Sequence, residues 1–239
     1  MTIAVCMATY NGGKFIQGQI TSILSELGSS DALLISDDGS TDDTMEKVLS
    51  IEDSRILIFQ NARNLGYVRN FETVIARVVD AEYIFFSDQD DIWSPGRLQE
   101  MVACLKKSQK NILFGQFDVM GEGSLPNAVT TDQLPDNRLK SLCKLFLGLP
   151  QFPYYGSTMA ISMVARSYLF PIPIPGISHD IWAALLGNFK GDIAYLPKIV
   201  THRRLHGGNL TNPNRSLYDK IKTRGLWIAG LIIFLWRNC

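Results

Sequence analysis

Three aspartates fall within four positions, at Asp88, Asp90 and Asp91, and their type and spacing point to metal chemistry. Carboxylates this close repel one another, so their clustering costs free energy unless a cation lies among them. Hard divalent cations such as Mg²⁺ and Mn²⁺ take oxygen ligands, often one or two carboxylates together with phosphate oxygens of a substrate. The cluster therefore predicts a metal site that receives a phosphorylated ligand. The alternative is an acidic turn solvated at the surface.

A second acidic stretch follows the apolar run 32–35, which we expect to be a strand. The polar residues 40–42 are good helix caps and account for a helix over 44–49. Capping does not account for Asp37 and Asp38, which precede the turn at the carboxyl end of the expected strand. Open α/β sheets bind their ligands at that end, so these two carboxylates are candidate ligand contacts.

Other candidates lie outside the acidic stretches. Asp180 opens an expected helical run over 183–186, where it is either the helix N-cap or a general base toward a hydroxyl. The segment 201–211 places two of the three histidines and two arginines beside a glycine pair, which suits a phosphate or a metal-bound diphosphate. Arg69 is either a diphosphate contact or a surface charge.

The elements that must position these residues alternate in type through the first 107 residues. We expect strands at 3–7, 32–35, 55–59 and 83–86, and helices at about 14–27, 44–49, 69–79 and 97–107. Such alternation favours a mostly parallel α/β sheet flanked by helices, with right-handed crossovers. The glycine pair at 12–13 breaks the first run and predicts a close approach of backbone to a ligand.

The second half of the chain is less regular. A strand at 112–120 precedes a polar excursion over 121–137, which is either a lid or acceptor contact or a tolerated insertion. We further expect a helix at 139–149, an apolar segment at 159–164 and a stiff extended segment at the prolines of 171–175.

The composition limits the class of protein. At 239 residues, 46% of them hydrophobic, the chain fits one large domain or a domain with a smaller annex. The 23 basic and 23 acidic residues balance, which gives no reason to expect a nucleic-acid partner. Four cysteines without CxxC pairing predict reduced thiols in a cytosolic compartment, and the first residues look like a strand rather than a secretory signal.

The C-terminal run 226–236 is uncharged and mostly apolar, with basic residues on both sides. The run is too short to cross a bilayer, since a span needs about 20 residues. We expect a helix that lies in the membrane interface, with tryptophans near both ends and basic side chains toward anionic lipids. The alternative is a helix packed on the domain or on another subunit.

In their order along the chain, these motifs resemble a family 2 glycosyltransferase with the GT-A fold. The matching segments are 7–12, 37–42, 64–66, 87–93, 179–182 and 204–206 with Asn209. The form of segment 87–93, together with Asn70-Phe-Glu72, is similar to the bacterial rhamnosyltransferase-like branch that builds O-antigen and capsule polysaccharide. The resemblance implies a GT-A domain over 1–211, with a donor-nucleotide half at 1–110 and an acceptor half at 111–211. A C-terminal helical segment follows at 212–239.

The resemblance also implies roles for single residues. Asp88 would contact ribose or metal, Asp90 would ligate Mn²⁺ or Mg²⁺, and His206 would complete the metal or diphosphate site with Arg204 close by. Asp180 would take the proton from the acceptor hydroxyl, giving inversion in a single displacement. The donor would be held by Thr9, Tyr10, Asn11, Asp37, Asp38 and Arg69. Many family members carry an acid where this chain has His179, which leaves open whether His179 tunes the base or contacts the acceptor.

The implied donor is a nucleotide-diphosphate sugar, with dTDP-rhamnose as the first choice and a UDP-hexose as the alternative. The implied acceptor is a saccharide linked to undecaprenyl diphosphate, so the enzyme would be peripheral on the inner face of the bacterial inner membrane. The oligomeric state stays open. Two other classes remain: a nucleotidyltransferase, although 12–14 is too short for a phosphate loop, and a catalytically silent sugar-nucleotide or polysaccharide-binding module.

Overall fold

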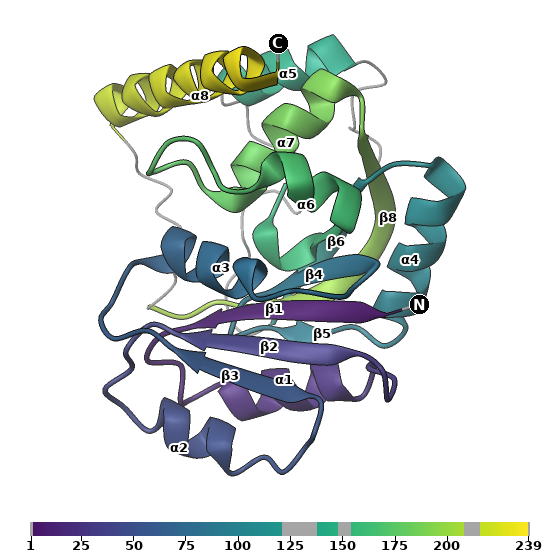
Figure 1. The fold of residues 1–239 in the computed structure, drawn as a ribbon, viewed down its shortest axis with the longest axis vertical. Coiled ribbons are helices and arrows are strands. Elements are labelled where there is room, and N and C mark those ends of the chain that lie inside the picture. The colour runs from purple at the N-terminus through teal and green to yellow at the C-terminus, as the bar shows by residue number, and fades with distance from the viewer. Residues whose placement is uncertain (1, 121–137, 148–153, 208–215, 239) are drawn as a thin grey trace.

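An eight-stranded mixed sheet in the order β3-β2-β1-β4-β7-β6-β8-β5 separates two layers of helices (Figure 1). The structure is a computed structural model that describes residues 2–120, 138–147, 154–207 and 216–238. The excursion over 121–137 and Asn209 lie outside these described residues. The strands are β1 (Ile3–Thr9), β2 (Ala32–Asp37), β3 (Ile56–Gln60), β4 (Tyr83–Ser87), β5 (Ile92–Trp93), β6 (Ile112–Met120), β7 (Met159–Ser162) and β8 (Ile193–Arg204).

The first half of the sheet is parallel, as the alternation of elements predicts. β1 pairs in parallel with β2 on one side and with β4 on the other, and β2 pairs in parallel with β3. Thr9 lies opposite Asp37, and Met7 lies opposite Ser87, so the carboxyl ends of the three strands meet at one edge. The chain changes direction of winding between β1 and β4, which is where open α/β sheets form a ligand crevice.

The second half adds mixed pairing that the sequence patterns did not indicate. β7 runs antiparallel between β4 and β6, β8 is parallel to β6, and the short β5 pairs antiparallel with β8. β5 has two residues, too few for a periodic signal. β8 carries several polar and half-buried residues toward its carboxyl end. There the strand that pairs with its outer side is β5, which is only two residues long. The segment after 201 is therefore partly strand rather than only a flexible loop.

Helices cover both faces of the sheet. α1 (Ile16–Leu24), α2 (Thr44–Leu49) and α4 (Arg97–Ser108) pack on one face. The other face carries α3 (Tyr67–Ala76), α5 (Arg138–Leu147), α6 (Met163–Leu169), α7 (His179–Lys190) and α8 (Leu217–Asn238). Alternate strand residues supply the two cores, so that Phe85 faces one layer and Phe86 the other, both fully buried. Burial on both faces explains why these strands are continuous apolar runs.

Two segments differ from the sequence expectation. The apolar segment at 159–164 is not uniform, because β7 ends at Ser162, whose hydroxyl accepts from the amide of Ala165 and caps α6. The proline segment is not a straight extended rod. The chain bends at Pro171, Pro173 and Ile174 and turns at Pro175 and Gly176, where the φ of Gly176 is +93°.

The C-terminal helix α8 is longer than the apolar run and packs on the domain through one side. Trp227 is 4% exposed and meets the ring of Phe146 edge-on at 5.8 Å, while Phe234 lies edge-on to Trp182 at 6.4 Å. The expectation that Trp227 lies in a membrane interface is therefore wrong, whereas Trp236 is exposed. Within the described residues, no helix combines the length and the apolar character needed to cross a bilayer.

We expect Gly230→Leu to lower the free energy of unfolding by about 1–3 kcal/mol, because overpacking forces side chains off their rotamers. A Cβ atom at Gly230 would lie 3.0 Å from the ring of Trp182 and 3.1 Å from Ile177 Cδ1. Gly225→Leu is the matched control, since a Cβ there meets nothing within 4 Å. Urea titrations that find the two variants equally stable would show that α8 does not dock through this face.

Candidate active site

The loops that follow β1 and β2 are bonded to each other at the carboxyl edge of the sheet. The amide of Asp38 donates to the carbonyl of Thr9 at 2.9 Å. The amide of Asn11 donates to Ser40 Oγ at 2.8 Å, and Asn11 Oδ1 accepts from the amide of Thr41 at the same distance. Asn11 adopts a positive φ of 48°, which lets its side chain reach back to the β2 loop. The two predicted nucleotide-contact loops therefore form one unit.

Asp37 and Asp38 are both buried and both bind backbone donors. Asp37 accepts from the amide of Ser40 at 3.0 Å and from its hydroxyl at 2.5 Å. Asp38 accepts from the amides of Leu65 and Gly66 at 2.9 Å each, which orders the loop before α3. These carboxylates thus shape the crevice, and their contact with a nucleotide stays a prediction.

Gln89 joins the β1 loop to the acidic loop, a role that the sequence did not indicate. Its Oε1 accepts from Thr9 Oγ1 at 2.5 Å and from the amide of Tyr10 at 2.9 Å, and its Nε2 donates to the carbonyl of Tyr10 at 3.1 Å. A Cβ at Gly12 would lie 2.2 Å from Gln89 Oε1. The missing side chain at Gly12 thus makes room for Gln89, and a close approach of this backbone to a ligand stays a prediction. The signal in the sequence was the position of Gln89 between two candidate metal ligands, Asp88 and Asp90.

Asn70 is a second structural contact that sequence reasoning missed. It is buried on α3, and its Nδ2 donates to the carbonyl of Ser36 at 2.9 Å and to that of Thr9 at 3.3 Å. Its Oδ1 accepts from Asn61 at 3.0 Å. A buried amide that binds the ends of two parallel strands holds the crevice in register. The signal was a polar residue on the apolar face of a helix.

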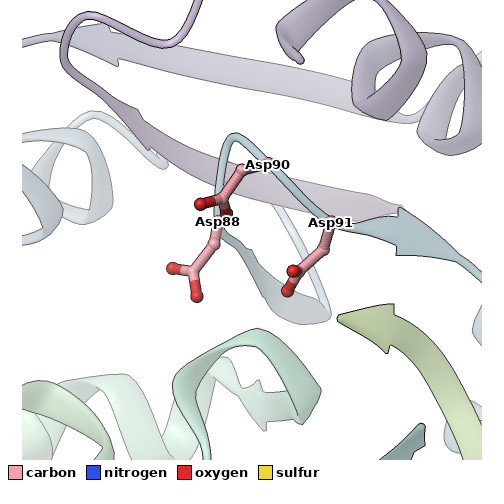
Figure 2. A group of neighbouring side chains, drawn as sticks. All are labelled: Asp88, Asp90 and Asp91. Atoms are coloured by element: carbon pink, nitrogen blue, oxygen red, sulfur yellow. The ribbon is translucent and has the colours of Figure 1, made fainter. Parts of the chain in front are cut away.

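The three aspartates of the β4–β5 loop offer ligand atoms within 4.8 Å of one another (Figure 2). Asp91 is 2% exposed, and its Oδ2 finds no hydrogen-bond donor among the described residues. Burial, followed by the charges of Asp91 and Asp90, raises the pKa of Asp88 well above its usual range. Burial and the charge of Asp90 raise the pKa of Asp91 to about 6. The loop thus concentrates negative charge that water does not compensate.

The residues present fit a hard divalent cation. The donors are carboxylate oxygens, and Asp91 Oδ2 is a buried acceptor without a hydrogen-bond donor among the described residues. A cation at this position would compensate the burial and the mutual repulsion that together raise the pKa values of Asp88 and Asp91. The prediction that the acidic stretch is only a solvated turn does not agree with the burial of Asp91.

The end of β8 meets the acidic loop, as expected for His206 and Arg204. His206 Nε2 lies 2.8 Å from Asp90 Oδ2, and its ring stacks on Phe15 with centroids 4.6 Å apart. The amide of Arg204 donates to Asp91 Oδ1 at 3.1 Å, and its Nε donates to the carbonyl of Asp90 at 3.2 Å. The structure therefore brings together residues up to 116 positions apart in the sequence.

Asp180 is the second residue of α7, and the N-cap position belongs to Ser178, so the interpretation of Asp180 as the N-cap is wrong. Its Oδ1 accepts from the amide of Ile181 at 2.8 Å. Asp180 is half-buried, and its charge contributes to the raised pKa values of Asp88 and Tyr155. It thus lies within electrostatic reach of the acidic loop, as a base opposite a metal-bound donor must.

His179 and Arg69 have local partners. His179 is 4% exposed, and its ring lies 4.2 Å from that of Phe71 and 5.2 Å from that of Phe86. Burial lowers its pKa, so the neutral ring acts as core packing beneath Asp180 rather than as an acceptor contact. Arg69 pairs with Glu72 on its own helix at 2.6 Å, and its contact with a diphosphate stays a prediction.

The fold and the site define the class of GT-A glycosyltransferases, in which a sheet edge with an acidic loop receives a nucleotide sugar. The family model described as Glycosyl transferase family 2 matches residues 4–166, more than half of the chain. The chain belongs to glycosyl transferase family 2.

Individual relatives and solved structures agree with this family. The chain is similar to the UDP-Glc:alpha-D-GlcNAc-diphosphoundecaprenol beta-1,3-glucosyltransferase WfgD of Escherichia coli, with 28% identity over 77% of this chain and 69% of that protein. It is 38% identical to the dTDP-rhamnosyl transferase RfbG of Shigella flexneri, over 44% of this chain and 38% of that protein. The crystal structure of S. aureus TarS 1-349 in complex with UDP-GlcNAc matches with a TM-score of 0.75 and 17% identity, over 95% of this chain and 66% of that one. The chain thus spans about two thirds of the length of WfgD and of the TarS fragment.

We expect Mn²⁺ to raise the melting temperature more at pH 7.5 than at pH 5. A pKa of about 6 for Asp91 means that protons occupy the cluster below this pH and compete with the cation. The raised pKa also makes the metal-free fold more stable below pH 6 than above it, since the folded state binds the extra proton. Differential scanning fluorimetry at both pH values tests this, with Asp91→Asn as the control that should reduce the pH dependence. A shift that is equal at both pH values would contradict it.

Proposed function

We propose that the chain is an inverting glycosyltransferase that moves a sugar from a nucleotide-diphosphate donor to a hydroxyl group of a saccharide acceptor. The observation that carries the proposal is the contact of Asp90 with His206, which joins the acidic loop to the end of β8. This contact completes a site with carboxylates, an imidazole and the Arg204 guanidinium on one edge of the sheet. Such a site suits a metal-bound diphosphate better than a neutral ligand.

The donor nucleotide would lie along the β1 and β2 loops. Tyr10 is 44% exposed there, so its side chain is accessible to a base, and its backbone is fixed by Gln89. Thr9 and Asn11 lie on the same loop, and Asp37 and Asp38 order the loop beside it. This placement supports the roles that the resemblance implies for these five residues. Exposed aromatic faces stack on bases without demanding a particular one.

Asp90 and His206, with Asp88 beside them, would hold Mn²⁺ or Mg²⁺. When bound, the ion supplies positive charge to the diphosphate leaving group. Arg204 lies close enough to share this role, since its side chain bonds to the carbonyl of Asp90 and its guanidinium lies 5.2 Å from the ring of Phe15. In this arrangement the nucleotide diphosphate would stay bound while the sugar is transferred to the acceptor.

Asp180 would act as the general base. The acceptor oxygen forms a bond to the anomeric carbon while the bond from that carbon to the donor diphosphate breaks, and the acceptor proton passes to the Asp180 carboxylate. Attack from the face opposite the leaving group inverts the configuration. The electrostatic coupling of Asp180 to Asp88 supports this geometry, because both must face the same sugar.

The names of the relatives suggest the substrates. RfbG is a dTDP-rhamnosyl transferase and WfgD uses UDP-Glc, so dTDP-rhamnose stays our first choice of donor and a UDP-hexose the alternative. WfgD acts on a diphosphoundecaprenol-linked sugar. We propose the same type of acceptor here, presented at the inner face of the bacterial inner membrane.

Calorimetric titration with dTDP-rhamnose, UDP-glucose and UDP-GlcNAc, with and without Mn²⁺, tests this function. We expect metal-dependent binding of one donor that Asp90→Ala weakens about 10–100-fold. Asp180→Asn should keep donor binding and lower turnover about 10²–10⁴-fold, since it removes only the base. Asp80→Ala, at an exposed position, is the control for loss of one negative charge. If Asp90→Ala binds donor as tightly as the parent, the acidic loop is not the donor site. Binding without turnover in the parent would instead identify a silent binding module.

Peripheral membrane contact through α8 forms part of the proposal. Tyr218, Ile221, Ile228, Ile232, Leu235 and Trp236 are exposed. At 100° per residue these six side chains fall on one side of the helix, opposite Trp227 and Phe234, and we call them the outer stripe. Lys222 borders it on one side and is exposed as well. An apolar stripe bordered by a cation fits the surface of an anionic bilayer.

Replacing two residues of the outer stripe should release the protein from membranes. We expect Ile228→Glu with Ile232→Glu to reduce binding to phosphatidylglycerol vesicles at least tenfold, since each buried isoleucine contributes about 1.5–3 kcal/mol. Val164→Glu is the control, because it changes an equally exposed apolar residue on α6. Cosedimentation measures both. Equal binding of the double variant and the parent would exclude the outer stripe as the membrane contact.

A further inference from the structure

Arg97 is a fully buried cation behind the acidic loop, and it has no role in the site described so far. It is the first residue of α4, directly before the buried Leu98, and its guanidinium lies 4.0 Å from the centre of the Trp93 ring. Burying a charged side chain costs free energy unless hydrogen bonds or opposite charges compensate it. The partners of Arg97 therefore indicate what it does.

The hydrogen bonds of the Arg97 guanidinium reach three separate segments. Nη2 donates to the carbonyl of Ser157 at 2.7 Å and to that of Phe86 at 3.3 Å. Nη1 donates to Thr201 Oγ1, and Thr201 Oγ1 in turn donates to the carbonyl of Ser157 at 3.1 Å. The planar fork of an arginine can hold several acceptors in fixed directions, which a lysine cannot.

Two of these acceptors lie a few residues from a residue of the proposed site, and the third lies in the turn before β7. Phe86 is two positions before Asp88 on the chain that leads out of β4. Thr201 lies on β8, three positions before Arg204. Ser157 belongs to the short helical turn (Gly156–Thr158) that links Tyr155 to β7. One side chain thus ties the acidic loop, the end of β8 and the turn before β7 together.

The charges around Arg97 also link it to the acidic loop. The acceptors of its described hydrogen bonds are carbonyl and hydroxyl groups without formal charge. The carboxylates whose charges act on it most are Asp91 and Asp88, which counter the effect of burial that lowers its pKa to about 9. Arg97 stays protonated at neutral pH, so the acidic loop has a permanent positive charge on its buried side.

We propose that Arg97 is a positioning residue of the metal and diphosphate site, which holds the acidic loop in register with the end of β8. The inference rests on the proposed function, because it assigns a purpose to the register of Asp88, Asp90 and His206. Arg97 itself touches neither substrate nor metal.

The direction of the effect on metal affinity separates positioning from charge. Removing a buried positive charge next to the cluster would strengthen Mn²⁺ binding if electrostatics alone acted. Loss of the fork instead lets the two segments shift, and loss of a residue that orients metal ligands weakens metal binding about 10–100-fold. We therefore expect Arg97→Met to weaken Mn²⁺ binding at least tenfold, and Arg97→Lys, which keeps the charge but not the fork, to weaken it as well.

The experiment is direct Mn²⁺ titration of the folded proteins, followed by isothermal calorimetry or by the free Mn²⁺ paramagnetic signal. Arg55→Met is the matched control, because Arg55 also donates to two carbonyls, those of Leu24 and Leu27, but lies beside Asp53 instead of the acidic loop. It should lower stability and leave the Mn²⁺ affinity within about twofold. Thr201→Val removes one acceptor of the fork and should weaken Mn²⁺ binding about threefold, which keeps the test open if Arg97→Met does not fold.

The two proposals fail in different ways. If the parent protein binds no Mn²⁺, the proposed function loses its metal site. If the parent binds Mn²⁺ and the folded Arg97 variants or Thr201→Val bind it equally or more tightly, only the positioning role is overturned. A loss of affinity in Arg55→Met as large as in Arg97→Lys would also overturn it, because general destabilisation would then explain the effect.

Discussion

The loop after β4 holds three carboxylates within 4.8 Å of one another, and the segments around it are arranged to tolerate that charge. The ring of His206 approaches from one side, the backbone amide of Arg204 binds Asp91 from another, and Arg97 lies buried behind. These partners are not enough to return the pKa of Asp91 to the usual range, since it stays near 6. The site therefore has negative charge that its protein partners do not fully compensate, which favours binding of a divalent cation and the diphosphate that it carries.

The sequence was sufficient to predict the parallel half of the sheet and the residues at its edge. Strands such as β1 and β4 are buried on both faces, so they read as continuous apolar runs whose carboxyl ends are marked by Thr9 and Ser87. It was not sufficient for Gln89 or Asn70, because their backbone and side-chain partners lie up to 80 residues away in the chain. β8 was missed because a proline and a lysine interrupt its apolar residues and polar residues fill its carboxyl end, so it shows no regular apolar period.

For helix α8, the apolar composition alone does not show which side chains pack on the domain and which face solvent. The apolar run 226–236 has apolar residues on every side, and only the packing shows that Trp227 and Phe234 are committed to the domain while Ile228 and Ile232 are not. The two interpretations drawn from the sequence, a membrane helix and a packed helix, therefore do not exclude each other. One side of α8 docks on the domain, which leaves the outer stripe available for a second surface.

The bond between His206 and Asp90 spans 116 residues and crosses from one half of the sheet to the other. Closing so long a loop carries an entropic cost, so we expect this contact to form after the more local contacts of β1 to β4. A chain that has assembled only β1 to β4 already carries the acidic loop but not the imidazole that completes the site. The proposed cation affinity would thus be a property of the finished fold, and a bound ion would shift the folding equilibrium toward the one state in which all parts of the sheet are joined.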